Sequence, residues 1–262
     1  MPNQKPKTTN YPITNQKIPP AFTGFKIAQI SDLHIIKGRA PRIERTLAQT
    51  AKITPDIIVI SGDFINNEKT DLGAAAEIMK DFTKIAPTYF IPGNHESYIG
   101  ENYYPLEKSL ERAGAVILHN RKTAIEKDGE FFNLYGLADY GIYCGEKLDE
   151  TLLRQKLADL GDLNPAAFNV LLTHRPELFD FYAEKGFDLV FTGHAHGGQF
   201  GFPFKNGLYS PGQGLFPKLT NGTHKKNKTT MIISRGLGDG DLPIRFANPH
   251  EIVTATLRIP TP

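Results

Sequence analysis

Five short segments of this 262-residue sequence contain residue types that bind metal ions. Each segment directly follows an apolar run, and the chain reverses there through Gly, Pro or Ser. Oxygen and imidazole donors without thiolate suit Mn, Fe or Zn better than a structural zinc, and far better than Ca. We therefore expect a metal site assembled from all five segments. Its candidate residues are Asp32, His34, Asp63, Asn94, His95, His174, His194 and His196.

The number of donors favours two metal ions over one. A single ion takes about four to six ligands, fewer than this set of donors offers. In hydrolytic two-metal sites, two ions about 3.5–4 Å apart share a carboxylate and a hydroxide. Two carboxylates with two divalent cations leave a charge of about +2, or about +1 after a bridging hydroxide. Such a centre attracts an anionic phosphoryl group and neutralises charge in its transition state.

The elements that must position these residues alternate between apolar runs and helical periods. Helices are predicted over residues 42–53 and 71–84. This alternation indicates crossover connections and a mostly parallel sheet, whose strands end at the edge where open α/β folds bind ligands. The apolar runs that precede the five segments are residues 25–30, 57–60, 89–91, 170–172 and 189–191.

The rest of the chain supports one domain over residues 21–262. Residues 197–219 are rich in Gly, Pro and aromatic residues and have no helical period. Residues 1–20 are polar and rich in Lys and Pro, without the apolar region of a signal peptide, and we expect a disordered arm or linker there. Further helices are predicted near 106–113, 149–160 and 176–184, and further strands near 116–118, 123–126, 131–135, 230–234 and 252–257.

Composition excludes several classes of function. The 30 Lys and Arg against 28 Asp and Glu leave a net charge of +2, too near neutral for a sequence-independent nucleic-acid binder. The single cysteine, Cys144, excludes a disulfide framework and a Cys-rich metal site. No apolar run approaches the ~18–20 residues of a membrane helix, so we do not expect this chain to span a bilayer.

Taken together and in this order, the five segments resemble the motifs of the calcineurin-like metallophosphoesterases. The resemblance implies an α/β fold, in which a two-sheet β-sandwich is flanked by helices and holds two divalent metal ions at its strand ends. It also implies a metal-dependent phosphoesterase. The matching segments are Asp32-x-His34, Gly62-Asp63, Gly93-Asn94-His95-Glu96, Thr173-His174 and Gly193-His194-Ala195-His196.

The resemblance also assigns a role to each residue of these motifs. One metal would take Asp32, His34 and His196, and the other would take Asn94, His174 and His194, with Asp63 bridging the pair. His95 would remain without a metal and donate a proton to the leaving oxygen. Glu96 would orient His95, or would instead cap the turn that follows. The implied mechanism is in-line attack on phosphorus by a metal-bridging hydroxide, without a phosphoenzyme.

A narrower resemblance points to a bacterial branch of the family. Some members of that branch hydrolyse UDP-2,3-diacylglucosamine, and others are cell-envelope phosphoesterases. The branch usually carries an N-terminal membrane or export segment, so the resemblance implies a phosphorylated small-molecule or lipid substrate. It also implies membrane anchoring or export through a segment absent from this chain, which by itself is expected to be soluble. The matching residues are Gly197-Gly198-Gln199, Ser234-Arg235-Gly236-Leu237-Gly238 and Pro243-Ile244-Arg245-Phe246.

Several residues near the motifs have two interpretations. Arg175 could clamp phosphate or form a surface ion pair. Arg235 could bind substrate phosphate or pin the C-terminal loop, and pinning is the interpretation favoured for Arg245. The aromatic residues of 199–219 could line an apolar substrate groove or form a packed loop. Residues 225–228 are interpreted as a solvated hairpin tip rather than a membrane patch.

Two questions about function remain open from the sequence. The motifs build the same centre for phosphomonoester, phosphodiester and pyrophosphate cleavage, so they do not choose among these bonds. The rival class is a non-catalytic metal-binding module that holds a partner through the metal edge or through the aromatic loop 197–219. Loss of a metal ligand or of His95 would mark such a module, and this sequence retains all of them.

Overall fold

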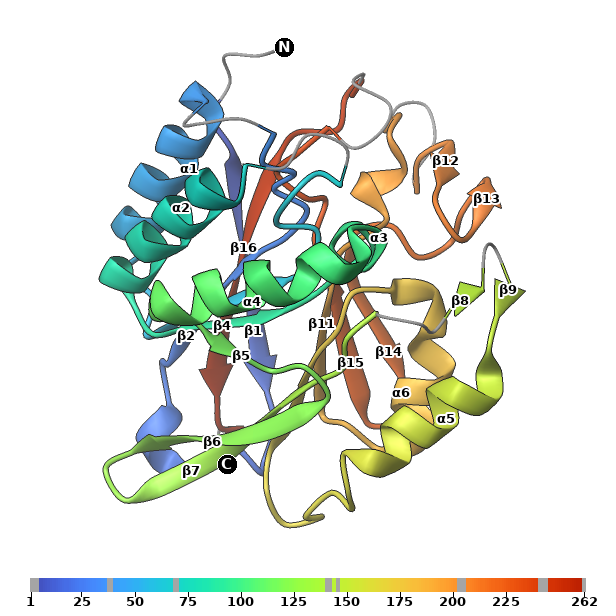
Figure 1. The fold of residues 1–262 in the computed structure, drawn as a ribbon. Coiled ribbons are helices and arrows are strands. Elements are labelled where there is room, and N and C mark those ends of the chain that lie inside the picture. The colour runs from blue at the N-terminus through green and yellow to red at the C-terminus, as the bar shows by residue number, and fades with distance from the viewer. Residues whose placement is uncertain are drawn as a thin grey trace.

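Strands buried on both faces form two six-stranded sheets that pack against each other, with helices on their outer faces (Figure 1). This arrangement confirms the expected α/β fold with two sheets flanked by helices. The computed structural model describes residues 5–36, 40–67, 71–139, 143–144, 147–201, 206–239 and 245–260.

The first sheet contains the strands that precede three of the candidate motifs. Its β2, β3 and β4 run parallel, as the crossover pattern predicts, and β16 pairs antiparallel with β2. The crossover helices are α1 (Pro41–Ile53) and α2 (Leu72–Ile85), followed by α3 (Asn94–Tyr98), a 3-10 turn η2 (Gly100–Asn102) and α4 (Tyr103–Arg112). In order across the sheet, the strands are β1 (Lys7–Thr14), β16 (Glu251–Arg258), β2 (Lys26–Ile30), β3 (Ile57–Ser61), β4 (Thr88–Ile91) and β5 (Val116–Ile117).

The second sheet contains the strands that precede the other two motifs. Its β7, β10, β11 and β15 are parallel to one another, with antiparallel strands at both edges. Helices α5 (Glu150–Asp159) and α6 (Phe179–Lys185) accompany it. In order across the sheet, the strands are β14 (Gly222–Lys226), β15 (Thr229–Ile233), β11 (Leu189–Thr192), β10 (Asn169–Leu172), β7 (Glu130–Gly136) and β6 (Arg121–Lys127).

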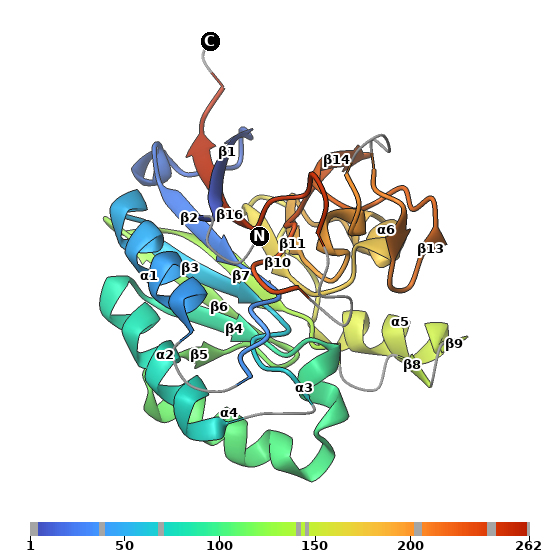
Figure 2. The same cartoon turned by 90° about the horizontal axis from the view of Figure 1, so that it is seen from above.

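In the described part of the chain, the buried apolar side chains form three cores. Strand β3 contributes to two of them, which explains why its sequence is a continuous apolar run. Its Ile58 and Ile60 belong to the core shared with α1, α2 and α4, whereas Ile57 and Val59 belong to the core between the sheets. Because successive strand residues point to opposite faces, a strand covered on both sides needs an apolar residue at every position. A third core lies between the second sheet and the helices α5 and α6, which occupy the opposite side of the molecule from α1 and α2 (Figure 2).

The N-terminal segment corrects one expectation. Residues 7–14 are not a disordered arm: they form β1, which pairs in parallel with β16 along its whole length. The following residues turn inward, and Ile13, Ile18 and Phe22 are buried in the core between the sheets. Pro12 is tolerated because β1 is an edge strand.

Shorter elements complete the chain. Residues 20–22 form a 3-10 turn η1 (Pro20–Phe22), and the helix expected over 176–184 consists of a 3-10 turn η3 (Pro176–Leu178) followed by α6. The loop 197–219 contains a 3-10 turn η4 (His196–Gly198) and a hairpin of β12 (Tyr209–Ser210) and β13 (Gly214–Leu215). A second small hairpin joins β8 (Tyr143–Cys144) to β9 (Lys147–Leu148). Phe202 and Phe204, two of the aromatic residues singled out in the sequence, lie outside the described residues.

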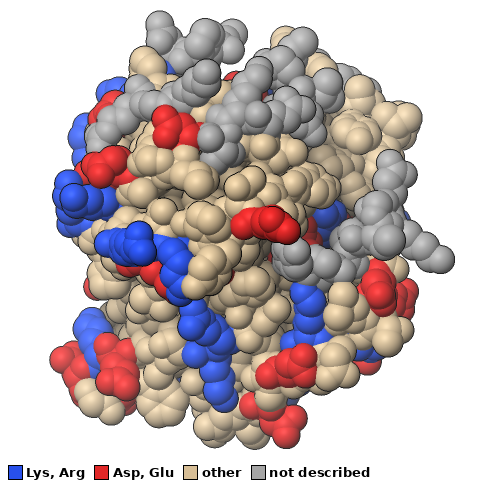
Figure 3. Space-filling model, viewed as in Figure 1, with Lys and Arg blue, Asp and Glu red and all other residues tan. Residues whose placement is uncertain are grey.

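Charge and hydropathy agree with the sequence analysis. On the face seen in Figure 3, Lys and Arg are interspersed with Asp and Glu over the described residues. This mixture agrees with the net charge of +2. Within the described residues, no helix combines the length and the apolar character needed to cross a bilayer.

Candidate metal centre

The five candidate segments meet at one end of the two sheets. Three of them follow the parallel strands β2, β3 and β4, and two follow the parallel strands β10 and β11. Parallel neighbours end at the same edge of a sheet, so the topology brings side chains more than 160 residues apart into contact. All eight candidate side chains belong to buried residues, none more than 7% exposed.

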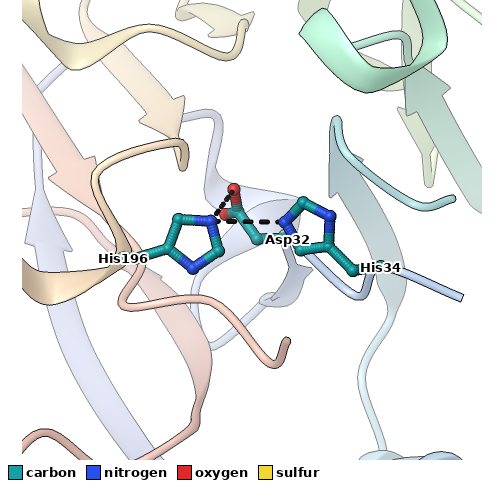
Figure 4. Close-up of side chains that lie close together, drawn as sticks. All are labelled: Asp32, His34 and His196. Carbon is teal, nitrogen blue, oxygen red and sulfur yellow. Dashed lines mark hydrogen bonds and ion pairs between the residues drawn. The ribbon is translucent and has the colours of Figure 1, made fainter. Parts of the chain in front are cut away.

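Asp32, His34 and His196 form the first cluster (Figure 4). The Nε2 atoms of His34 and His196 are 3.2 Å apart, and His196 Nε2 is 3.5 Å from Asp32 Oδ1. Figure 4 shows the two rings converging on the carboxylate from loops of different sheets. These are the three residues that the resemblance assigns to one metal.

The second cluster surrounds Asp63. Its Oδ2 is 3.1 Å from His174 Nε2, and the same nitrogen is 3.1 Å from Asn94 Oδ1. One ligand atom each from Asp63, His174 and His194 lies within 4.8 Å of the others. The structure thus brings together the four residues that the resemblance assigns to the second metal and its bridge.

Asp63 also connects the two clusters. Its Oδ2 is 3.9 Å from His34 Nε2 and 3.9 Å from His95 Nε2. Its Oδ1 accepts a hydrogen bond of 2.9 Å from the backbone N–H of His95. The His95 ring meets the His34 ring edge-on, with the centroids 4.5 Å apart. His95 therefore forms a third group with His34 and Asp63, in which the ligand atoms lie within 4.8 Å of one another.

Strained backbone is concentrated at these residues. Five of the seven candidate ligands have positive φ: Asp32, His34, Asp63, His194 and His196. This conformation is uncommon outside glycine, and each instance costs of order 1–3 kcal/mol. With this backbone conformation all five side chains point into the site, which an extended backbone at the strand ends would not achieve.

Glycines in the motifs allow the chains to approach closely. A Cβ at Gly193 would overlap Ser31 Oγ and Asp32 Oδ2, and one at Gly93 would overlap Asp63 Oδ1. Gly93, which precedes Asn94, and Gly193, which precedes His194, are therefore required by packing against a neighbouring carboxylate. In these two motifs the glycine leaves room for a carboxylate from another motif, and the residue after the glycine is itself a candidate ligand.

A buried polar chain beneath the site was missed in the sequence. The amide of Gln29 donates to Ser61 Oγ at 2.8 Å and to the carbonyl of Thr192 at 2.8 Å, so it links the two sheets. Ser61 Oγ donates to Ser31 Oγ, which donates to Asp32 Oδ2 at 2.6 Å. The available signal was a glutamine in the middle of an apolar run.

The side chain of Glu96 connects two of the motif segments. Its carboxylate accepts hydrogen bonds from the backbone N–H groups of Gly93 (2.7 Å), Asp63 (2.9 Å) and Ile65 (3.0 Å). It caps the N-terminus of the short helix α3 and fixes the Asp63 loop, and none of these three hydrogen bonds involves the His95 ring. Burial raises the pKa of Glu96 to about 7.

Arg175 is buried rather than placed at the surface. Its Nε donates to Asp139 Oδ1 at 2.6 Å and its Nη1 to Glu177 Oε1 at 3.3 Å. The same Nη1 is 3.1 Å from His194 Nε2. The expected surface ion pair is wrong, because this ion pair is buried beside a candidate ligand. Asp139 was not singled out in the sequence.

Arg235 and Arg245 hold the C-terminal loops. Arg235 donates to the side-chain oxygens of Asn221 (2.8 Å) and Asn248 (3.1 Å). Arg245 donates to the carbonyls of Arg235 and Gly238, and its Nη2 is 3.0 Å from His196 Nδ1. These contacts match the pinning interpretation for both arginines.

Charges at the site depend on one another. Burial alone would raise the pKa of Asp63, but His174 and His95 hold that pKa well below its usual value. Burial alone would lower the pKa of His174, but Asp63 raises it to about 10. Burial lowers the pKa of His34 to about 3 and keeps the pKa values of His194 and His196 well below the usual range. The site thus holds an ionised Asp63 paired with a protonated His174, while His34, His194 and His196 are neutral.

The donor set fits divalent cations. Neutral imidazoles and ionised carboxylates are the forms that bind metal ions. His34 Nε2 and His196 Nε2 are 3.2 Å apart, within hydrogen-bond distance of each other, so both face the point where one cation would bind. His34 Nδ1 is buried and has no hydrogen-bond partner among the described residues. Three triads at this edge have ligand atoms close enough to hold an ion.

Comparison with known proteins identifies the family. The sequence model of the calcineurin-like phosphoesterases matches residues 25–198, about two thirds of the chain and all five motifs. An uncharacterized metallophosphoesterase of Campylobacter jejuni, Cj0846, is 30% identical over 98% of this chain and 65% of its own length. The chain therefore spans less than two thirds of that relative.

A second relative and a solved structure agree with this match. YkuE of Bacillus subtilis, also an uncharacterized metallophosphoesterase, is 30% identical over 96% of this chain and 85% of its own length. The crystal structure of TT1561 from Thermus thermophilus is 14% identical and shares the fold, with a TM-score of 0.56 over 83% of this chain and 92% of that one. With its motifs gathered at one sheet edge, this chain belongs to the calcineurin-like phosphoesterase family of metal-dependent hydrolases.

Proposed function

We propose that this chain is a phosphohydrolase that works with two divalent cations. The observation that carries the proposal is the position of Asp63, whose Oδ2 lies 3.1 Å from His174 Nε2 and 3.9 Å from His34 Nε2. One carboxylate thereby lies between the two clusters of imidazoles. Asp32, His34 and His196 would hold one cation, and Asn94, His174 and His194 the other.

The cations would be Mn, Fe or Zn, because the donors are imidazoles and oxygens without thiolate. When bound, they supply positive charge to phosphoryl oxygens and lower the pKa of the water that acts as nucleophile. The chain contributes a buried, preorganised set of donors that need not rearrange during the reaction. No covalent phosphoenzyme is required.

His95 supplies the proton in this proposal. Its backbone N–H is fixed by Asp63, and its ring lies against that of His34, so the imidazole is held at the site. An imidazolium there donates its proton to the oxygen of the departing group as the bond to phosphorus breaks. Glu96 acts on this step indirectly, since it fixes the loop that carries Asp63.

The substrate class is a phosphorylated small molecule or lipid. The resemblance of Gly197-Gly198-Gln199 and of residues 234–238 to the cell-envelope branch supports an envelope substrate, with a nucleotide-sugar pyrophosphate such as UDP-2,3-diacylglucosamine as one candidate. The site itself fits phosphomonoesters, phosphodiesters and pyrophosphates equally. A panel containing one member of each class, assayed with the same preparation, distinguishes them.

Metal removal tests the proposal. The purified chain is stripped with a chelator, dialysed and assayed for hydrolysis of nitrophenyl phosphate and bis-nitrophenyl phosphate before and after addition of Mn²⁺, Fe²⁺ or Zn²⁺. We expect activity to disappear on stripping and to return with one of these ions, and elemental analysis to find two ions per chain. Unchanged turnover after stripping would contradict the proposal. Two bound ions without release of product from any substrate class would favour the non-catalytic module instead.

A further inference from the structure

A second surface of the molecule combines exposed apolar and basic side chains away from the metal ligands. It consists of the end of the β12–β13 hairpin and the strand β14 that follows. Figures 1 and 2 both show this hairpin at the periphery of the molecule. We call it the 215–228 surface, and the residues used in the argument are Leu215, Phe216, Lys218, Lys225, Lys226 and Lys228.

Its apolar residues are exposed to an unusual degree. Leu215 is 67% exposed and the adjacent Phe216 is 65% exposed, whereas Phe22, Phe64 and Phe132 are 0% exposed. Single exposed apolar residues are common, but two neighbours at the end of a projecting hairpin leave a bulky apolar tip in water.

The charge of this surface is concentrated and of one sign. Residues 215–228 contain four Lys and no Asp or Glu, while the rest of the chain contains 26 Lys and Arg and 28 Asp and Glu. The acidic groups that face it come from η3 and α6: Asp180 pairs with Lys226 at 2.7 Å, and Glu177 accepts from Arg175. Among the described residues, Lys218, Lys225 and Lys228 form no ion pair.

A hollow joins the apolar and basic parts. Its volume is about 570 Å³, and its lining includes Phe216 and the three lysines Lys218, Lys225 and Lys226. Glu177 and Asp180 also line it, where Asp180 pairs with Lys226 and Glu177 with Arg175. A cavity of this size accommodates a group as large as a lipid headgroup. Lysines on the edge strand β14 would also discourage pairing with another strand, but that role does not explain an exposed Leu and Phe on a neighbouring hairpin.

We propose that the 215–228 surface docks on an anionic lipid bilayer. Leu215 and Phe216 enter the interface between headgroups and acyl chains, and the lysines contact lipid phosphates, a combination that binds peripheral proteins to membranes. The sequence alone favours a solvated hairpin tip for residues 225–228, whereas the structure places Lys225 and Lys226 around the same hollow as Phe216.

Docking of this surface would also hold the metal centre in a fixed position relative to the bilayer. The backbone N–H of Leu208, next to β12, donates to the carbonyl of Gly198 at 2.9 Å, and Gly198 ends the turn that begins at His196. On the other side of the hairpin, Gly212 packs closely against Glu177, which accepts from Arg175 beside His194. The hairpin is thus joined to both halves of the candidate site.

Vesicle co-sedimentation tests the proposal with the chain as it is. Wild type is mixed with vesicles of phosphatidylcholine alone, or of phosphatidylcholine and phosphatidylglycerol in equal parts, at low and high salt. We expect binding only to the anionic vesicles, weakened by salt. Because each Lys near an anionic surface contributes about fivefold in partitioning, K218E/K225E should lower the partition coefficient at least about tenfold. L215S/F216S should lower it at both salt concentrations.

Matched variants elsewhere serve as controls. K52E/K80E reverses two exposed lysines on α1 and α2, and F131S removes a Phe that is 47% exposed on β7. Both should bind vesicles as wild type does, and all variants should keep the thermal unfolding midpoint. The proposal is overturned if wild type does not bind anionic vesicles, if it binds neutral ones equally, or if the controls lose binding to the same extent. It is also overturned if analytical ultracentrifugation shows a dimer that only L215S/F216S dissociates, because the occupant is then a second copy of the chain.

Discussion

The metal edge and the 215–228 surface differ in how the chain builds them. The metal edge collects side chains from five separate segments, buries all of them and accepts positive φ at five of seven candidate ligands. The 215–228 surface comes from one continuous stretch and leaves Leu215 and Phe216 about two-thirds exposed. A site that needs fixed geometry is therefore built on rigid strand ends, whereas a surface that only needs to touch a partner can be built on a hairpin.

Removing Asp63 should have the largest effect at the metal edge. D63A eliminates the carboxylate shared by both clusters, so we expect kcat/KM for an aryl phosphate ester to fall on the order of a thousandfold. Elemental analysis should find fewer than two ions per chain. D71N is the control, because Asp71 is not a candidate ligand, its side chain caps α2 by accepting from the N–H of Ala74, and asparagine caps helices equally well. Activity of D63A within tenfold of wild type would mean that the clusters act independently.

Filling the space at Gly193 should have the next largest effect. In G193A the new Cβ would overlap Ser31 and Asp32, and the surrounding strand ends cannot move apart without breaking the polar chain. We expect a loss of about 2–4 kcal/mol in the free energy of unfolding, measured with urea, together with loss of activity. G73A on α2 is the matched control and should be neutral or stabilising by up to about 1 kcal/mol. Equal stability of the two variants would show that the close approach at Gly193 is not needed.

Disrupting the polar chain at Gln29 should have a moderate effect on both stability and activity. Q29A leaves Ser61 Oγ without its buried donor and removes one of the two donors to the carbonyl of Thr192, which keeps the backbone N–H of Ser234, so we expect a loss of about 1–3 kcal/mol in the free energy of unfolding. Activity should fall about tenfold, since Asp32 loses its indirect support. Q49A, which removes only a partly buried hydrogen bond to Thr8, should change both quantities little. If Q29A lowered the stability but left kcat unchanged, the hydrogen-bonded chain from Gln29 to Asp32 would have no role in activity.

The contrast between the metal edge and the 215–228 surface explains which features the sequence predicts. The five motifs identify the residues of the metal edge because His, Asp and Asn after apolar runs have a distinctive chemistry, and parallel strands bring such ends together. Gln29 was missed because a polar residue inside a strand is visible as a link between sheets only when both sheets are placed. The role of Glu96 stayed open between two interpretations for a similar reason, since two of its three donors lie on another loop.

Contacts between distant segments account for the other differences. The strand β1 was predicted to be disordered because its alternation is weak and its partner β16 begins more than 230 residues later. Its pairing depends on residues far away in the sequence, which an analysis of local patterns does not take into account. The 215–228 surface likewise required the structure, because the sequence shows lysines and aromatic residues but not which of them are exposed.

The smallest effect is expected from changing the 215–228 surface in the absence of lipid. Leu215 and Phe216 are about two-thirds exposed, so L215S/F216S should shift the free energy of unfolding by no more than about 0.5 kcal/mol. Its kcat/KM on a soluble aryl phosphate should equal that of wild type, because neither side chain reaches the metal edge. With a phosphorylated substrate embedded in anionic vesicles, the same variant should lose activity in proportion to its lost vesicle binding. A drop on the soluble substrate would instead mean that the hairpin supports the site through its contact with Gly198, and the two regions would then be one functional unit.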